Sequence, residues 1–415
     1  MTTVLTRTER AALTRESIID SALVLFTTRG FRAVSLREIA AAAGISHPSL
    51  LKHFGDKAAV LDAVLGRFHE QTNPATLHVD PTILPFPAVA EYNATVPGYL
   101  PLFATLTGEA SAASHPAHDV FRRRCAHVRS AATEFLASAA SPRLVAADRD
   151  PQAEALRLVA TWDSLQVVQQ YLPERVDVAQ TLRRHDAMLA RPVGWRDGHP
   201  ATDHARRPFA VPRIDDAEEV GGYRSGRERR AKIVRDAMTL FAREGYGDTT
   251  LRDIAERVGV SKSALYHHFS SKEQLLLAVL SERDRLIEHP LIAQPPGCAA
   301  DLLRGLADGA ERNTADQPGL VEVYAALTGE AVPAEHPAHG YFAHRYGLAL
   351  DTFTRMFVQA ADDGDLPPHR DPAHEALWLL ALWDGLQYQW LYDRGAVDVA
   401  SHLRAHLADV LPGMS

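Results

Sequence analysis

Apolar residues recur with helical spacing from the start of the chain. One set lies at positions i, i+4, i+7 and i+8, which places its members on one face of an amphipathic helix: Ile18, Ala22, Leu25 and Phe26. Gly30 follows at a position where glycine commonly caps a helix C-terminus. The pattern predicts a helix that ends near residue 30.

Two shorter helices are predicted next. Ser35 is a suitable N-cap for a short helix with an apolar face, and Gly44 is expected to end that helix. Ser46 is a suitable N-cap for the helix that follows. A helix of about ten residues, a glycine turn and a second short helix form the helix-turn-helix layout.

Longer segments with helical periodicity fill the rest of this half. They lie at about 98–112, 117–140, 152–171 and 176–190, and the second half of the chain has their equivalents. Alternating β-branched residues bounded by turns, which would indicate strands, do not recur. The sequence therefore predicts an all-α protein.

The two halves of the chain repeat each other. With a shift of 215, residues 16–65 match residues 231–280 at 19 of 50 positions. Further along the shift becomes 221, and three motifs repeat there: LTGEA at 106–110 and 327–331, HPAH at 115–118 and 336–339, and VDVA at 176–179 and 397–400. The period is far too long for a solenoid, so the chain holds two copies of one domain.

Five parts are expected. They are a helix-turn-helix domain at 10–70, a helical domain at 71–190, a linker at 191–226, a second helix-turn-helix domain at 227–285 and a second helical domain at 286–412.

The linker is identified by its composition. Four prolines, five glycines and mixed charges without periodicity stand between the copies. Trp195 and Phe209 are apolar enough to anchor parts of it on a neighbouring surface.

Composition and charge narrow the class of protein. The 415 residues carry a net charge of -8, yet residues 1–70 total +2 and residues 222–285 total +4, which segregates basic charge onto the helix-turn-helix domains. No apolar run approaches the roughly 18 residues that would span a membrane, and no secretion signal is apparent. Cys125 and Cys298 are expected to be free thiols. We expect a cytoplasmic protein without membrane association.

The second helix-turn-helix carries a known signature. GVSKSALYHHFSSKEQLL, which begins at residue 259, resembles the DNA-binding signature of the TetR family of transcription regulators. The matching positions span three helices: Thr250, Leu251, Ile254, Ala255, Gly259, Ser261, Leu265, Tyr266, Phe269, Lys272 and Leu275. The distal segments LTGEA, HPAH and LWDGLQYQWLYD are similar to the ligand-binding domain of many members.

The resemblance implies that some side chains of the second copy contact phosphates and others contact bases. Residues at the family's phosphate-binding positions are Thr250, Arg252, Tyr266 and Lys272. Phosphate contacts fix the register, whereas contacts with base edges give sequence preference. The candidates for base contacts are Lys262, Ser263 and His267.

The first copy keeps part of this set and changes the rest. Four residues keep their places: Ser35, Arg37, His53 and Lys57. His47 replaces Lys262, Leu51 replaces the tyrosine, and Lys52 replaces His267. His47 and Ser49 are expected to face bases, and Lys52 to restore a cationic contact. A degenerate first copy that no longer binds DNA stays open, as does helix-turn-helix packing that serves no DNA contact.

Several side chains of the helical domains are candidates for a ligand site. The aromatic candidates, which at helical spacing are as often plain core, are Tyr99, Phe103, Trp162, Tyr324, Trp383 and Tyr388. Asp163 and Asp384 each follow a tryptophan in an apolar helix, and a buried carboxylate needs a partner. The HPAH histidines have the spacing of metal ligands, but a role as caps or pocket-lining groups is the preferred interpretation, and no metal or cofactor is predicted.

The arrangement of two copies suggests the mode of action. Family members pair as homodimers through two long C-terminal helices of each subunit, so the resemblance implies a bundle of about 152–171 and 176–190 with 373–392 and 397–410. The chain would be a covalent pseudo-dimer, in which internal pairing replaces homodimerisation, on an asymmetric double-stranded DNA operator. A small-molecule effector would regulate it, with repression as the default. No catalytic constellation is present, and the competing hypothesis is a ligand-binding or scaffolding protein with vestigial DNA-binding helices.

Overall fold

The chain folds into helices throughout the part that the structure describes. The computed structural model covers residues 6–71, 84–138, 144–196, 206–210, 224–246, 249–292 and 297–413. These residues form eighteen helices, and their one β-type pairing is an isolated bridge between Pro208 and Cys298. The predicted all-α class is confirmed. None of the described helices is long and apolar enough to span a lipid bilayer.

Each copy contributes nine helices in the same order. Those of the first copy are α1 (Arg7–Arg29), α2 (Leu36–Ala42), α3 (His47–His53), α4 (Lys57–Gln71), α5 (Phe86–Thr95), α6 (Tyr99–Glu109), α7 (His118–Ser138), α8 (Pro151–Tyr171) and α9 (Val178–Leu189). Those of the second copy are α10 (Arg224–Glu244), α11 (Leu251–Val258), α12 (Lys262–His268), α13 (Lys272–Ile292), α14 (Ala299–Asp316), α15 (Pro318–Glu330), α16 (His339–Asp362), α17 (Pro372–Tyr392) and α18 (Val399–Val410).

The helix ends follow the capping residues read from the sequence. Ser35 and Thr250 form capping boxes at the starts of α2 and α11, because each hydroxyl accepts from the N3 amide while the N3 carboxylate accepts from the cap. Ser46 and Ser261 cap α3 and α12 in the simpler way. Gly30 ends α1 at φ 77°, a backbone conformation that favours glycine.

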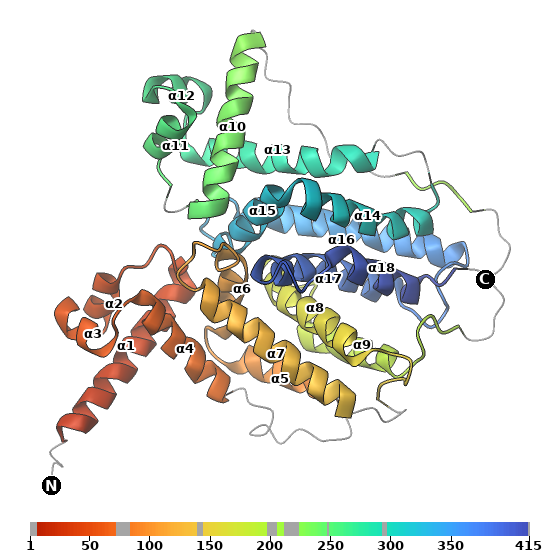
Figure 1. Cartoon of the computed structure of the whole chain (residues 1–415), viewed down its shortest axis with the longest axis horizontal. Coiled ribbons are helices and arrows are strands. Elements are labelled where there is room, and N and C mark those ends of the chain that lie inside the picture. Colours follow the sequence, from red (N-terminus) through yellow and green to blue (C-terminus); the bar gives the residue numbers. More distant parts are fainter. Residues whose placement is uncertain are drawn as a thin grey trace.

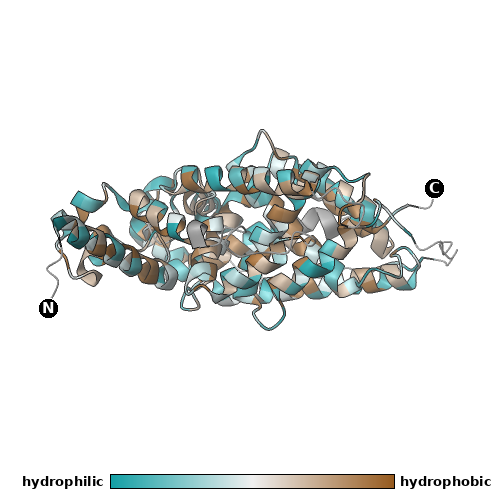
Figure 2. Ribbon diagram, turned by 90° about the horizontal axis from the view of Figure 1, so that it is seen from below, coloured by the Kyte–Doolittle hydropathy of each residue, from teal (hydrophilic) through white to brown (hydrophobic). Residues whose placement is uncertain are grey.

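The two helix-turn-helix domains lie on the same side of the molecule. Figure 1 shows α1–α4 at the lower left and α10–α13 above them, with α3 and α12 at the outer left. The helical domains of both copies fill the right side, with α8 and α17 between them. Figure 2, seen from below, shows an elongated molecule with the N-terminal end at its left tip.

The copies pack together through very close helix contacts. The most extensive pairing joins α8 with α17, and the next joins α6 with α15. At Gly385 of α17, an added Cβ atom would lie 1.9 Å from the Ala160 carbonyl oxygen of α8. At Gly108 and Gly329 it would lie 2.3 and 2.4 Å from a backbone oxygen of the opposite copy. Backbone therefore meets backbone at both crossings, which only glycine permits.

The predicted bundle was right about α8 and α17 and missed the α6–α15 pair. Helix α9 contacts α17 more lightly, mainly where the His185 ring stacks on Trp378 at a centroid separation of 3.5 Å. Helix α18 packs chiefly on α14 of its own copy.

Two tyrosines tie the copies together reciprocally. Tyr171, at the end of α8, donates its hydroxyl proton to the Thr328 carbonyl of the second copy. Its counterpart Tyr392, at the end of α17, donates to the Leu106 and Thr107 carbonyls of the first copy at 3.2 and 3.1 Å. The pairing is therefore close to two-fold symmetric at this end of the interface.

The far end of the interface is polar and loses this symmetry. Arg149 and Arg370 occupy equivalent positions, and each binds the carboxylate of Asp409 from a distance of 3.1 Å. Burial would raise the pKa of Asp409, but Arg370 and Arg149 outweigh burial and lower it. The Gly194 amide of the linker donates to the same carboxylate at 2.6 Å.

The described parts of the linker contact both copies. The Val193 amide donates to Asp148 of the first copy at 2.9 Å, and the contacts that follow join the linker to the second copy. Trp195 packs edge-on against His369 with ring centroids 4.7 Å apart. Arg196 donates to the carbonyls of Gly364, Asp365 and Pro412. The Phe209 amide donates to the Gly297 carbonyl at 3.0 Å.

Candidate nucleic-acid interface

Helix α12 presents a polar face and buries an apolar one. Leu265, inside the helix, and Phe269, at its end, are both fully buried and dock α12 on its domain. Three side chains on the opposite side are exposed: Lys262, Ser263 and His267. Tyr266 is 45% exposed, although a large aromatic side chain in a folded domain is usually covered. The exposed face has the polar groups that a helix in a major groove needs.

The residues around α12 are positioned by their own contacts. The Ser261 and Ser263 hydroxyls lie 3.0 Å apart, and the Lys262 ammonium lies 5.7 Å from the centre of the Tyr266 ring. Thr250 and Arg252 are exposed at the start of α11. The Lys272 ammonium at the start of α13 lies 4.1 Å from the centre of the Tyr246 ring, which directs it across the domain.

The first domain has the same framework with different side chains on it. Leu50 and Phe54 take the buried positions of Leu265 and Phe269. Leu51 stands where Tyr266 is and is 42% exposed, and Lys52 is exposed beside it. His47, Ser49 and His53 are half-buried along α3.

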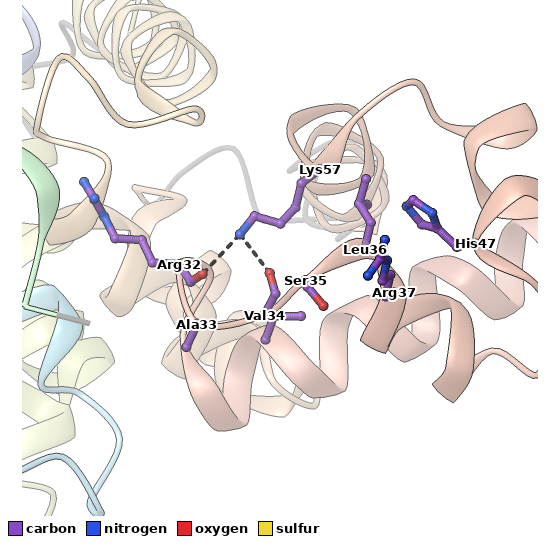
Figure 3. A pocket seen from close by; sticks show the side chains of 8 residues that line it. All are labelled: Arg32, Ala33, Val34, Ser35, Leu36, Arg37, His47 and Lys57. Carbon is purple, nitrogen blue, oxygen red and sulfur yellow. Dashed lines mark hydrogen bonds between the residues drawn. The ribbon is translucent and has the colours of Figure 1, made fainter. Parts of the chain in front are cut away.

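A groove runs beside α3 at the start of α2. It encloses about 540 Å³ and is lined by Arg32, Ala33, Val34, Ser35, Leu36, Arg37, His47 and Lys57 (Figure 3). Ser35 and Arg37 are exposed along its edge. Of its three basic residues, Arg37 is the one exposed at the edge of the groove, where its charge suits contact with a phosphate backbone.

Lys57 is held inside its own domain. Its ammonium donates to the carbonyls of Phe31, Arg32 and Val34 at 2.9, 3.2 and 2.8 Å. Figure 3 shows two of these bonds as Lys57 reaches the turn between α1 and α2. In this arrangement Lys57 fixes the turn that lines the groove, and its contact with phosphate stays a prediction.

The helical domain of the first copy contains a buried charged cluster. The Arg124 guanidinium lies 4.2 Å from the centre of the Phe103 ring and 3.5 Å from the Asp163 carboxylate. Gln389, from the second copy, donates to the same carboxylate at 3.0 Å. Burial raises the pKa of Asp163, while Arg124 acts to lower it. Tyr99 stacks on Phe103 and so belongs to this cluster.

The second copy has a related cluster that is richer in tyrosine. The Arg283 guanidinium lies 3.9 Å from the centre of the Tyr324 ring, and Arg345 approaches the same ring at 5.4 Å. Tyr346 donates its hydroxyl proton to Asp384 at 2.8 Å. Burial, with Asp384 as the next cause, raises the pKa of Tyr346 well above its usual value.

The remaining candidates are placed differently. Trp162 packs edge-on against Phe86, away from the contacts of Asp163. Trp383 is half-buried, while Tyr388 is buried. Sequence reasoning missed Arg124, Arg283 and Gln389, because nothing local distinguishes the two arginines from the arginines beside them.

The repeated LTGEA and HPAH motifs join each DNA-binding domain to its helical domain. The Tyr246 amide, just after α10, donates to the Glu330 carboxylate at 2.7 Å. In HPAH, the first histidine accepts from the amide two residues on, in both copies. The last histidine hydrogen-bonds the carbonyl eight residues back, at Ala110 and Ala331. These histidines hold a turn, which agrees with the preferred interpretation of caps.

Known proteins resemble the chain in both copies. The family described as bacterial regulatory proteins, tetR family, matches residues 18–64 and 233–279. The HTH-type transcriptional regulator YfiR of Bacillus subtilis, itself described as uncharacterized, is 28% identical over 42% of this chain and 85% of its own length. The A-factor receptor protein of Streptomyces griseus is 25% identical over 44% of this chain and 62% of its own length.

Among solved structures, a TetR family transcriptional regulator from Agrobacterium tumefaciens is 22% identical. The match covers 45% of this chain and 99% of that one, with a TM-score of 0.39.

Proposed function

The chain belongs to the TetR family of transcriptional regulators, and from that premise we propose that its two copies act as a covalent pseudo-dimer on one DNA operator. It is a DNA-binding transcriptional regulator and not an enzyme, because the family consists of regulators. The observation that carries the proposal is the reciprocal pairing of Tyr171 with the second copy and of Tyr392 with the first. This is the relation that two subunits have in a homodimer.

Fusion changes how the pairing depends on concentration. One helix-turn-helix reads only a few base pairs, so useful affinity needs two domains at half-sites one helical turn, about 34–36 Å, apart. Because both domains belong to one chain, each is present at an effective concentration on the order of millimolar near the other. Binding to DNA should therefore not weaken through dissociation of the halves on dilution.

The two reading helices support an asymmetric operator. His47, Pro48 and Ser49 begin α3, where Lys262, Ser263 and Ala264 begin α12. A lysine donates to guanine acceptors, whereas a histidine beside a proline offers a different donor and a different shape. The two subunits of a homodimer have identical reading helices, whereas the two reading helices of this chain differ in sequence. We therefore expect them to prefer unlike half-sites.

Regulation by small molecules is supported by the two buried clusters. An effector shifts the population of states only by as much as its affinities for those states differ. Asp163 is paired with an arginine and a glutamine, but Asp384 is paired with a tyrosine. The sites should therefore prefer different effectors, with repression by promoter occlusion as the default.

Selection of random duplex DNA by the purified chain tests the proposal. Two unlike half-sites about one turn apart are expected after sequencing of the bound fraction. Lys262→Ala should relax selection at one half-site only, and His47→Ala at the other. Arg312→Ala removes an exposed charge from α14, far from both domains in sequence, and serves as the charge-matched control.

A perfect inverted repeat would refute the asymmetric operator while leaving the pseudo-dimer standing. Absence of any enriched sequence from the folded, effector-free chain would favour the scaffolding alternative, in which the DNA-binding helices are vestigial. In that case the double variant Lys272→Ala, Tyr266→Ala should keep all partner binding.

A further inference from the structure

Arg32 crosses from the first DNA-binding domain to the second. It lies in the turn between α1 and α2, and its Nη1 group donates to the carbonyl oxygen of Glu244, the last residue of α10. The side chain also lies flat on Gly245, where an added Cβ atom would come within 3.0 Å of Arg32 Cδ. Gly245 also has φ 81°, a backbone conformation that favours glycine, so both the backbone and the close approach of Arg32 require glycine here.

The chemistry of the contact is favourable. The last carbonyls of a helix lack partners within the helix and carry the negative end of its dipole. A guanidinium supplies several N–H donors in a rigid plane and keeps its charge at all relevant pH values. Ser114, also of the first copy, donates its hydroxyl proton to the neighbouring Arg243 carbonyl. Two successive carbonyls at the end of α10 are therefore bound by the first copy.

The sequence of the second copy offers no counterpart. At the shift of 215, the residue equivalent to Arg32 is Gly247, which has no side chain to donate. At the shift of 221, the equivalent of Ser114 is Glu335. A carboxylate cannot donate a proton to a carbonyl at neutral pH. These two contacts therefore run from the first copy to α10, and the sequence gives neither of them an equivalent in the opposite direction.

The same turn lines the basic groove of the first domain. Lys57 donates to the carbonyls of Arg32 and Val34 on the groove side, while Figure 3 shows the Arg32 side chain pointing away from Lys57. The turn is therefore held from α4 on one side and bound to α10 on the other. A movement of α10 would displace the lining of the groove.

We propose that Arg32 is a positioning residue that holds the two DNA-binding domains at one separation and so sets the half-site spacing that the chain accepts. The spacing part of the proposal rests on the proposed function, whereas the separation of the domains does not. Separate measurements can therefore test the two parts.

The separation is measured without DNA by pulsed electron paramagnetic resonance. Spin labels are attached through Asp62→Cys in α4 and Leu277→Cys in α13, which are equivalent positions and both exposed. Cys125 and Cys298 are buried, and labelling of the parent chain checks that they stay unmodified. We expect one narrow distance distribution for the parent and a distribution at least twice as wide for Arg32→Ala.

Arg29→Ala is the matched control. Arg29 lies three residues away with the same charge, but its salt bridge of 2.7 Å joins it to Glu38 within its own domain. It should leave the distribution narrow. Ser114→Ala should widen the distribution less than Arg32→Ala does. Equal melting temperatures of the variants show that folding is intact.

Spacing is then measured by titrating duplexes in which two base pairs are added between the selected half-sites. Two base pairs shift a half-site by about 7 Å and rotate it by roughly 70°. The parent and Arg29→Ala should lose at least tenfold in affinity, and Arg32→Ala less than threefold. A narrow distribution for Arg32→Ala overturns the proposal. If no half-sites are selected at all, the proposed function fails, and the distance distributions alone decide the role of Arg32.

Discussion

Replacing Gly385 with alanine tests the packing that joins the two copies. Gly385 lies in α17, where the helix crosses α8 with backbone against backbone. An added Cβ atom would lie 1.9 Å from the Ala160 carbonyl oxygen and 2.4 Å from its carbonyl carbon. Ordinary contact begins near 3.4 Å, so the helices would have to move apart.

The expected cost follows from that displacement. A carbonyl group cannot rotate away as a side chain can, so α8 and α17 must separate by on the order of 1 Å along their contact. Inserting atoms into a close-packed core usually costs about 1–3 kcal/mol, and a backbone obstacle belongs at the upper end. Alanine has a higher helix propensity than glycine, which stabilises the variant by about 1 kcal/mol and offsets part of this cost. We expect a net loss of roughly 2 kcal/mol.

The assay is urea unfolding, combined with the hydrodynamic radius of the folded chain. Gly66→Ala is the control, because Gly66 lies inside α4 with nothing within 4 Å of an added Cβ atom. That variant should be as stable as the parent or slightly more so. Gly385→Ala should unfold at lower urea and show a larger radius. A midpoint at or above that of the parent would refute the close approach of α8 and α17.

Three further predictions concern pH, hydrogen bonding and the connection to DNA. Burial lowers the pKa of His374 to about 4 and of His406 to about 3, so the stability they confer is complete above their unfolded pKa and is lost as pH falls below it. The free energy of unfolding, followed by thermal melting, should therefore fall between pH 6.5 and 4 by about 1.4 kcal/mol per pH unit for each fully titrating histidine. His406→Gln should make this pH dependence shallower. Tyr392→Phe removes a buried donor and should cost about 1 kcal/mol in chemical unfolding, whereas Tyr266→Phe, at an exposed position, should cost nothing measurable. Glu330→Ala leaves the Tyr246 amide without its acceptor and should speed hydrogen exchange at that amide at least tenfold; unchanged exchange would contradict the role given to Glu330.

Local features of the fold could be read from the sequence. Ser35 and Ser46 were expected as N-caps, and both accept a backbone hydrogen bond at a helix start, as do their counterparts Thr250 and Ser261 in the second copy. Capping depends on a few neighbouring residues, so its signal is local in sequence. The need of the Asp163 carboxylate for a partner could also be read from the sequence, as a candidate ligand site, but its partners Arg124 and Gln389 could not.

The contacts between copies could not be read in the same way. Gly108 and Gly329 are glycines inside apolar helices, a pattern that permits close approach but does not say to which helix. Gln389 reaches Asp163 across 226 residues, and Arg32 reaches Glu244 across 212. A single sequence carries no information on such pairs, which form only when the copies meet. The exposed face of α12 was predictable by contrast, because Leu265 and Phe269 fix its orientation.

The single carboxylate of Asp409 has a consequence for partner choice. In the first copy the equivalent position is Met188, so a pair of first copies would bury two Arg149 side chains without the acid that lies between the arginines here. A pair of second copies would instead have two such acids at the same place. Arg149 and Arg370 each also pair with a glutamate of their own copy, Glu154 and Glu375. A pair of first copies would therefore lose the bridging acid, and a pair of second copies would bury two excess acids, so the mixed pair is favoured.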